Sequence, residues 1–440
     1  MASASVKQLC DFVDASPTAF HAVENLQAAL VARGAQKLSE GEAWALEPGR
    51  SYFVARSGSA LVAFRPGLRP PAEEGFALAG AHTDSPALKA RLEKPLSARG
   101  LERAPVEVYG GPILSTWLDR PLSLAGRVAL RAQGGGLETR LLNFARPVGL
   151  IPNLAIHLNR EVNKGFEYNA QAHLPVLLSS DPLAAAGASG GAATQAALLR
   201  LVAAELGVEA GAILGADLYF VESQRVALIG ADGGLVNGYR LDDLTGCHAV
   251  LEGFLAASPA PHGQVACFLD NEEVGSRSVQ GADSSFLRDI LGRISALQGA
   301  GSEGFYRALS RSFSVSVDVA QAFHPSYAEK YDEAFAPLLN GGPAVKVNAN
   351  MKYATDAEAE ARFRLLCEAK GVPCQKFMSR ADTTPGSTIG PLSSSLTGIR
   401  TVDVGAPLLS MHSIRETVGA RDHEAMAAVL GLHFATPPSA

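Results

Sequence analysis

The sequence is poor in cysteine. Its 440 residues contain five cysteines, at positions 10, 247, 267, 367 and 374, and no two of them have CxxC spacing. An odd number of cysteines without that spacing argues against both a disulfide framework and a zinc site built from thiolates. Any bound metal would therefore have to be held by histidine and carboxylate side chains.

Positive charge and long apolar runs are also lacking. The formal net charge is -6, so nothing indicates a basic surface of the kind that binds nucleic acid or anionic lipid. No apolar run approaches the roughly 20 residues that a membrane-spanning helix needs. The first ten residues lack the basic start and apolar core of a secretory signal. We expect a cytoplasmic protein with no nucleic-acid or membrane partner.

The chain is longer than one typical domain, and its character changes twice. From about residue 90 to about residue 235, short β-like runs alternate with glycine- and proline-rich turns. The flanking parts instead alternate strand-like and helix-like patterns. These changes predict one α/β domain, made of residues 1–90 and 236–440, that is interrupted by a β-rich domain at 91–235. Within the insertion, residues 185–193 are mostly Ala, Gly and Ser and predict a loop.

The first candidate metal ligand follows a predicted strand. The α/β domain begins with two predicted helices between residues 6 and 33, and the buried strand expected at 76–81 runs directly into His82-Thr83-Asp84. A histidine at such a strand end can offer one ring nitrogen to a metal ion while a carboxylate holds the other. The motif is short, and a structural histidine that caps a loop would give the same pattern.

The most informative stretch is Asp270–Ser276, which follows the apolar run 265–269 and contains Glu272 and Glu273. Adjacent residues of a strand point to opposite sides, so the two glutamates cannot share one role unless the chain turns here. Hydrolysis at a metal centre needs one carboxylate on the metal and a second that takes a proton from water. A solvated acidic cluster that closes a strand fits these seven residues equally well.

Further acidic and histidine side chains follow other predicted strands. Asp242 and Asp243 open a helical pattern, where an aspartate serves either as an N-cap or as a carboxylate that bridges two metal ions. Asp318 ends one predicted strand, and His412 lies in the loop after another. Because strand ends in an α/β sheet meet at one edge, these loops are expected to lie together.

Residue types at the strand ends match a pair of zinc sites. Two histidines, two aspartates and a glutamate can bind two zinc ions, with one aspartate shared between them. The polar residues that fall just after the predicted strands are His82, Asp242, Glu272, Glu273, Asp318 and His412. A competing assignment is a three-histidine site of His82, His157 and His412, which would leave the strand-end carboxylates unused. Considered alone, His157 is more typical of a core or interface residue.

One lysine stands inside an apolar run. Lys346 is flanked by Ala344, Val345 and Val347. Such a lysine either faces water from an edge strand or is a partly buried ammonium that needs an anion.

Several of these segments together resemble one known family. They are His82–Pro86, Ile156–Leu158, Arg240–Asp242, Asp270–Ser276, Asp318–Pro325, Lys346–Asn348 and Met411–Glu416. In this order along nearly the whole chain, they are similar to the aspartyl aminopeptidase family of dizinc metallopeptidases. The resemblance implies a zinc-peptidase α/β domain, with helices on both faces of a central sheet, interrupted by a β-rich dimerisation domain. It also implies a cytosolic tetrahedral dodecamer that removes N-terminal Asp and Glu from peptides.

The resemblance also implies a role for individual residues. His82 and Asp318 would bind one zinc ion, Glu273 and His412 the other, and Asp242 would bridge the two. Glu272 would be the general base, Asp84 would orient His82, and His157 would reach the active site of a neighbouring subunit. The substrate-binding residues would be Lys346, Tyr353 and His324, with Lys346 receiving the acidic side chain.

Two positions depart from the family pattern. The family usually has asparagine where this chain has Asp243, which would change the charge next to the metal site. It commonly has histidine where this chain has Gln321, which bears on substrate selectivity. Two other functions remain compatible with the motifs: a catalytically silent shell or binding protein of the same fold, and a dizinc carboxypeptidase or deacylase.

Overall fold

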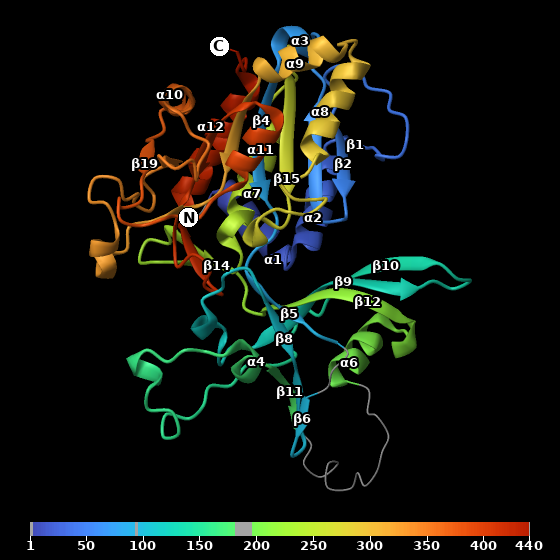
Figure 1. Ribbon diagram of the computed structural model, residues 1–440, viewed down its shortest axis with the longest axis vertical. Coiled ribbons are helices and arrows are strands. Elements are labelled where there is room, and N and C mark those ends of the chain that lie inside the picture. The colour runs from blue at the N-terminus through green and yellow to red at the C-terminus, as the bar shows by residue number, and fades with distance from the viewer. Residues whose placement is uncertain (1–2, 93–95, 181–195, 440) are drawn as a thin grey trace. The chain divides into compact units, whose positions relative to one another are not determined.

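The computed structural model describes residues 3–92, 96–180 and 196–439. The chain forms two compact units (Figure 1). The first consists of Met1–Ser85, Val226–Met411 and Glu416–Ala440, and the second of Pro86–Arg225 and His412–Arg415. Compared with the insertion expected at 91–235, residues 226–235 belong to the first unit, and a short return loop with His412 belongs to the second. The loop predicted at 185–193 lies outside the described residues.

A nine-stranded sheet is the centre of the first unit. Its order is β1-β2-β3-β15-β4-β16-β20-β18-β19. The strands are β1 Gln36–Lys37, β2 Tyr52–Arg56, β3 Ala60–Arg65, β15 Gly263–Leu269, β4 Phe76–His82, β16 Phe313–Val317, β20 Arg400–Gly405, β18 Ala344–Lys346 and β19 Gln375–Phe377. The four central strands, β15, β4, β16 and β20, are mutually parallel. Their carboxyl ends therefore lie at one edge of the sheet.

Helices cover both faces of this sheet (Figure 1). Alternate residues of β4 pack to opposite sides, since Ala79 and Ala81 join one apolar cluster while Phe76 and Leu78 join the other. The helices of the first cluster are α2 Ala19–Ala32, α7 Leu241–Ala256, α10 Ala357–Lys370 and α12 Ala420–Ala435. Those of the second are α8 Phe286–Leu297, α9 Ser302–Ser310 and α11 Ile389–Thr397. The predicted α/β class with helices on both faces is confirmed.

A smaller sheet completes the first unit, with the order β13-β14-β22-β21-β17. Its strands are β13 Ala227–Ile229, β14 Leu235–Gly238, β22 Glu416–Gly419, β21 Pro407–Leu409 and β17 Ala320–Gln321. Side chains of this sheet share an apolar cluster with helix α1 Ala4–Ala15. The short helix α3 Pro71–Glu74 precedes β4.

The second unit is rich in β structure. Five antiparallel strands form the sheet β10-β9-β12-β5-β8, and three more form β11-β7-β6. The strands are β10 Leu137–Asn143, β9 Leu122–Arg131, β12 Ile213–Glu222, β5 Ala87–Ala90, β8 Val106–Tyr109, β11 Val176–Ser180, β7 Leu101–Ala104 and β6 Leu96–Ala98, and the helices are α4 Ala170–His173 and α6 Ala197–Leu206. Among the described residues, no helix is both long and apolar enough to cross a membrane.

Candidate active site

Three of the parallel strands deliver the candidate ligands to the same edge of the sheet. β4 ends at His82, β15 ends three residues before Glu272, and β16 ends just before Asp318. β4 is hydrogen bonded to both β15 and β16 in parallel register. The loops that follow these strands are therefore neighbours, as the strand-end pattern predicts.

His82 is the centre of this edge. Its Nε2 lies 3.2 Å from Asp242 Oδ1 and 4.0 Å from Asp318 Oδ1. Its Nδ1 donates to the Asp84 carbonyl oxygen at 3.1 Å, and the Asp84 carboxylate lies 3.5 Å from the same nitrogen. All of these side chains are buried. The ring thus presents Nε2 to two carboxylates while Asp84 holds the other nitrogen.

A turn lets both glutamates face this edge. Asn271 has a positive φ of 62° and precedes a single 3-10 turn at Glu272–Val274. The Asp84 carboxylate fixes that turn, because Oδ1 accepts from the Glu272 backbone N–H and Oδ2 from that of Glu273, both at 3.1 Å. The opposite orientation expected for a straight strand does not apply, and the two side chains come from the same turn.

The two aspartates at the start of α7 have different partners. Asp243 accepts a hydrogen bond from the Gly246 N–H at 3.1 Å and so serves as the cap, and its other oxygen accepts from the His82 N–H at 3.3 Å. Asp242 instead faces His82. The Asp242 backbone N–H donates to Glu416 Oε2 at 2.9 Å. Glu416 lies in one of the motifs that carry the family resemblance, but the sequence assigned it no role.

Crowding of buried acids shifts their ionisation. Burial, together with the negative charge of neighbouring carboxylates, raises the pKa of Glu272 to about 8. For the same reasons the pKa values of Glu273 and Asp243 lie well above the ordinary value. Burial lowers the pKa of His82, but its hydrogen bonds to two carboxylates outweigh burial, so the net shift is well upward. A cation at this edge would remove the repulsion that produces these shifts.

The donor set fits zinc. His82 Nε2 and one oxygen each of Asp242 and Asp318 all lie within 4.8 Å of one another. One imidazole nitrogen and several carboxylate oxygens are typical ligands of Zn²⁺ in hydrolytic enzymes. His412 belongs to the second unit, where its Nδ1 donates to the Gly111 carbonyl at 3.0 Å. His157 also belongs to the second unit and lies in an exposed turn.

Lys346 adjoins the candidate ligand Asp318. It ends β18, which lies between β20 and β19, and its side chain is buried. The ammonium lies 3.2 Å from Asp318 Oδ2 and donates to the Val319 carbonyl at 2.9 Å. It also lies 5.3 Å from the centre of the Tyr353 ring. The edge-strand interpretation is wrong, since the ammonium is buried and already has an anion.

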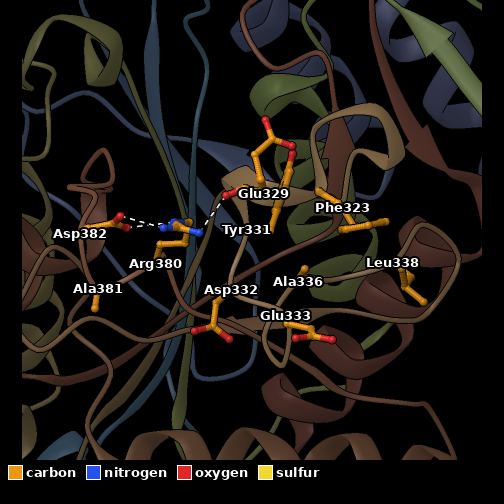
Figure 2. A pocket seen from close by; sticks show the side chains of 11 residues that line it. Phe323, Glu329, Tyr331, Asp332, Glu333, Ala336, Leu338, Arg380, Ala381 and Asp382 are labelled. Carbon is orange, nitrogen blue, oxygen red and sulfur yellow. Dashed lines mark hydrogen bonds and ion pairs between the residues drawn. The ribbon is translucent and has the colours of Figure 1, made fainter.

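A cavity of about 870 Å³ lies in the first unit (Figure 2). It is lined by residues between 323 and 338, which follow β17, and by residues 380–382. Arg380 stands between Asp382 and Glu329 (Figure 2), and it donates to the Asp382 carboxylate and to the Glu329 carbonyl. The other charged residues of the lining are Asp332 and Glu333. The cavity is therefore acidic.

The predicted substrate residue His324 is not among those that line this cavity. Its Nδ1 accepts from the Ser326 N–H at 3.2 Å, and its ring packs edge-on against Tyr327.

Comparison with known proteins gives a consistent result. The model of a family described as aminopeptidase I zinc metalloprotease (M18) matches residues 12–434. A relative from Pseudomonas aeruginosa, described as "Probable M18 family aminopeptidase 2", is 45% identical over 429 residues, which are 97% of each chain.

Two solved structures are similar in fold and sequence. One is the cryo-EM structure of an Ape4 and Nbr1 complex, with a TM-score of 0.93 and 36% identity over 98% of this chain and 85% of that one. The other is the S. cerevisiae mApe1 dodecamer, with a TM-score of 0.83 and 26% identity over 97% and 95% of the two chains.

Proposed function

This chain belongs to the aminopeptidase I zinc metalloprotease family (M18) and is therefore a zinc-dependent aminopeptidase, and we propose that it prefers peptides with N-terminal Asp or Glu. The silent-shell, carboxypeptidase and deacylase alternatives lose their support, because the family and the relatives are described as aminopeptidases. The observation that carries the proposed preference is the buried Lys346 ammonium 3.2 Å from Asp318.

The proposed centre holds two zinc ions. We assign His82 and Asp318 to one, Glu273 and His412 to the other, and Asp242 as the bridge. The short distances from His82 Nε2 to Asp242 and Asp318 support the first group. The His412 assignment rests on the family resemblance. When bound, zinc polarises the scissile carbonyl and lowers the pKa of water, which is the chemistry that peptide hydrolysis needs.

Glu272 is the proposed general base. It would take a proton from the attacking water and pass it to the leaving amine. Its backbone N–H is held by Asp84, so its position is fixed through the same aspartate that holds His82. Without a metal ion, burial and the neighbouring carboxylates raise its pKa to about 8, and a bound cation would lower that pKa, so that the carboxylate is ionised and accepts the proton near neutral pH. Asp84 is a positioning residue in this scheme.

Electrostatics supports an acidic preference. With Asp318 bound to a cation, the negative charge beside Lys346 is shared, and the ammonium can attract a second anion. A substrate without an acidic side chain would leave that attraction unused, and charge-assisted hydrogen bonds in buried sites are worth about 1.5–3 kcal/mol. Tyr353, which packs beside the ammonium, would form a wall of the same subsite.

The acidic cavity favours a second candidate, a preference for basic N-terminal residues. Glu329, Asp332 and Glu333 would attract a cationic side chain and repel an acidic one, and Arg380 is already paired with Asp382. An acidic side chain is therefore expected at Lys346 and not in this cavity.

A scan of hydrolysis rates over N-terminal residues, combined with Lys346→Met, separates the two candidates. We expect the wild type to favour Asp and Glu, and Lys346→Met to lower kcat/KM for those substrates by about 10–100-fold while Leu and Ala substrates change much less. Zinc content must be measured in parallel, because Lys346 also touches Asp318.

Lys376→Met is the matched control for this scan. Lys376 lies opposite Val345 in the neighbouring strand β19 and pairs with Glu360 at 2.7 Å. It should leave the substrate profile unchanged. An equal loss on all substrates in Lys346→Met would contradict the specificity role, and a wild-type preference for Lys or Arg would support the acidic cavity.

We further propose a cytoplasmic homo-oligomer, with the dodecamer of mApe1 as the guide to its size. The turn that carries His157 supports an interface, because Leu154, Ile156 and Leu158 around it are 56%, 46% and 75% exposed. His157 would then serve a neighbouring subunit's site. Light scattering measures the mass, and a fully active monomer would contradict both points.

A further inference from the structure

A second group of histidine and carboxylate side chains lies between helices α7 and α12 of the first unit. His248 and Glu252 are one helical turn apart on α7, so they project from the same side of that helix. His423 comes from α12, which packs against α7. We call His248, Glu252 and His423 the helix cluster. None of them is assigned to the hydrolytic centre.

The three donor atoms form a compact triangle. His248 Nδ1 lies 3.0 Å from His423 Nε2, and Glu252 Oε2 lies 3.7 Å and 3.6 Å from these two nitrogens. Zinc bound tetrahedrally at 2.0–2.1 Å requires its ligand atoms to be about 3.3 Å apart. The mean of the observed sides is close to that value, so small side-chain rotations would complete the geometry.

The surroundings suit a bound ion with access to solvent. His423 is fully buried and His248 nearly so, whereas one third of the Glu252 side chain is exposed. Ser5 Oγ donates to Glu252 Oε2 at 2.6 Å and so orients the carboxylate. The Phe12 ring packs against His248, with ring centres 5.5 Å apart. An ion could therefore enter from the Glu252 side and stay shielded on the other.

The pKa values of two of the three side chains are lowered. Burial and the neighbouring His423 lower the pKa of His248 to about 3, so its ring is neutral at pH 7. The His423 ring 3.6 Å away and the hydrogen bond from Ser5 lower the pKa of Glu252 to about 2, so it is ionised. His423 Nδ1 has no hydrogen-bond partner among the described residues. The polar contacts of this ring are therefore made through Nε2, inside the cluster.

We propose that the helix cluster binds a further divalent cation of the zinc class, with His248 Nδ1, His423 Nε2 and a Glu252 carboxylate oxygen as its protein ligands. A donor set of two imidazoles and one carboxylate favours zinc over magnesium or calcium. Three protein ligands would leave a fourth position for water. The ion would join α7, which begins with Asp242, to α12.

Zinc content of the full chain tests the proposal. Wild type, the double variant His248→Asn/His423→Asn, and Glu252→Gln are saturated with zinc, dialysed and measured by plasma mass spectrometry. The double variant and Glu252→Gln should each hold one zinc per chain fewer than wild type. The comparison uses a difference, so it does not depend on how many ions the hydrolytic centre holds or on substrate preference.

His21→Asn is the control for this measurement. The half-buried His21 ring lies in α2 and contacts the Thr18 hydroxyl at 2.8 Å. Its replacement should leave the zinc content at the wild-type value. Equal zinc content in wild type and Glu252→Gln would overturn the proposal and leave a proton shared by the two imidazoles, which also fits a 3.0 Å separation.

Thermal unfolding provides a readout that remains valid if the double variant folds poorly. A ligand that binds only the native state raises its melting temperature. Added zinc should raise the melting temperature of metal-free wild type more than that of Glu252→Gln, whose fold keeps both histidines. Aminopeptidase activity of zinc-loaded Glu252→Gln should equal that of wild type. Identical zinc-induced shifts in both proteins would contradict a site at the helix cluster.

Discussion

The active-site cluster, formed by His82, Asp242, Glu272, Glu273 and Asp318, and the helix cluster are built from the same kinds of side chain in opposite proportions. The first surrounds one histidine with carboxylates, and its pKa values shift upward. The second places one carboxylate beside two histidines, and the pKa values of His248 and Glu252 shift downward. Both groups are packed within the same domain.

The difference shows that the balance of charge, added to burial, decides what each group needs. Burial alone would raise the pKa of every acid and lower that of every histidine. The active-site cluster adds repulsion between like charges, which a divalent cation relieves. The helix cluster holds a single carboxylate, so it lacks this repulsion between like charges. We therefore expect the active-site cluster to depend on metal more strongly than the helix cluster.

The largest expected effect comes from removing a carboxylate charge in the active-site cluster. Glu272→Gln should lower kcat by about 10³-fold, because an amide cannot accept the proton of the attacking water. Zinc content should not change, since Glu272 is not one of the proposed ligands. Steady-state kinetics and metal analysis on the same preparation measure both quantities.

Glu252→Gln makes the same chemical change in the helix cluster and is the matched control for kinetics. Its kcat should remain at the wild-type value. If Glu272→Gln kept more than a tenth of the activity, the general base would have to be another residue, and the distinction between the clusters would fail.

The stability of the metal-free protein should depend on pH with opposite signs in the two clusters. In the active-site cluster, the pKa of Glu272 is about 8 in the folded state against an ordinary value near 4.5. The contribution of Glu272 to the free energy of unfolding is fully present below pH 4.5 and is lost as pH rises through 8. We expect chelated protein to lose about 2 kcal/mol between pH 6.5 and pH 8 in urea unfolding.

Zinc-loaded protein and metal-free Glu272→Gln test the cause of this fall in stability between pH 6.5 and pH 8, which we call the alkaline limb. Both should show a smaller decline than metal-free wild type, because the first neutralises the carboxylates and the second has one fewer. Equal declines in all three samples would mean that the acids are not crowded enough to need a cation.

The helix cluster gives a fall in stability at acidic pH, which is the acidic limb of the same experiment. The folded pKa of His248 is about 3 against an ordinary value of 6.5. Its contribution is present above pH 6.5 and is lost as pH falls towards 3, because the unfolded chain then binds a proton that the folded chain excludes. Other buried histidines add to this limb, and the pKa of His433 is about 4.

His248→Asn should therefore flatten the acidic limb by about 1 kcal/mol per pH unit and leave the alkaline limb unchanged. A change in both limbs would mean that the two clusters are coupled through α7.

Much of the active-site cluster was predictable from local patterns. His82 and Asp318 each follow an apolar run, and those runs are the parallel strands β4 and β16. Their meeting at one edge follows from parallel pairing. The direction of Glu272 and Glu273 was not predictable, because it depends on the left-handed conformation of Asn271 and on two hydrogen bonds to Asp84.

Contacts between residues far apart in the sequence were missed, because no local pattern links such residues. The sequence left open whether Lys346 faces water or is buried beside an anion, and the structure supplies Asp318, which directly follows strand β16. The spacing of four residues between His248 and Glu252 places them on one side of a helix, which could have suggested that both bind the same ion. Their partner His423 is 175 positions away from His248.

The sequence by itself determined which segments become strands and helices and which polar residues stand at their ends, because runs and periodicities of apolar side chains act locally. Only the tertiary structure decided which charges meet. The packing of α7 against α12 and the insertion of β18 between β19 and β20 bring together side chains that no local pattern links. Whether a buried carboxylate faces a lysine, an imidazole or another carboxylate is set by those contacts, and it fixes where this aminopeptidase needs its metal.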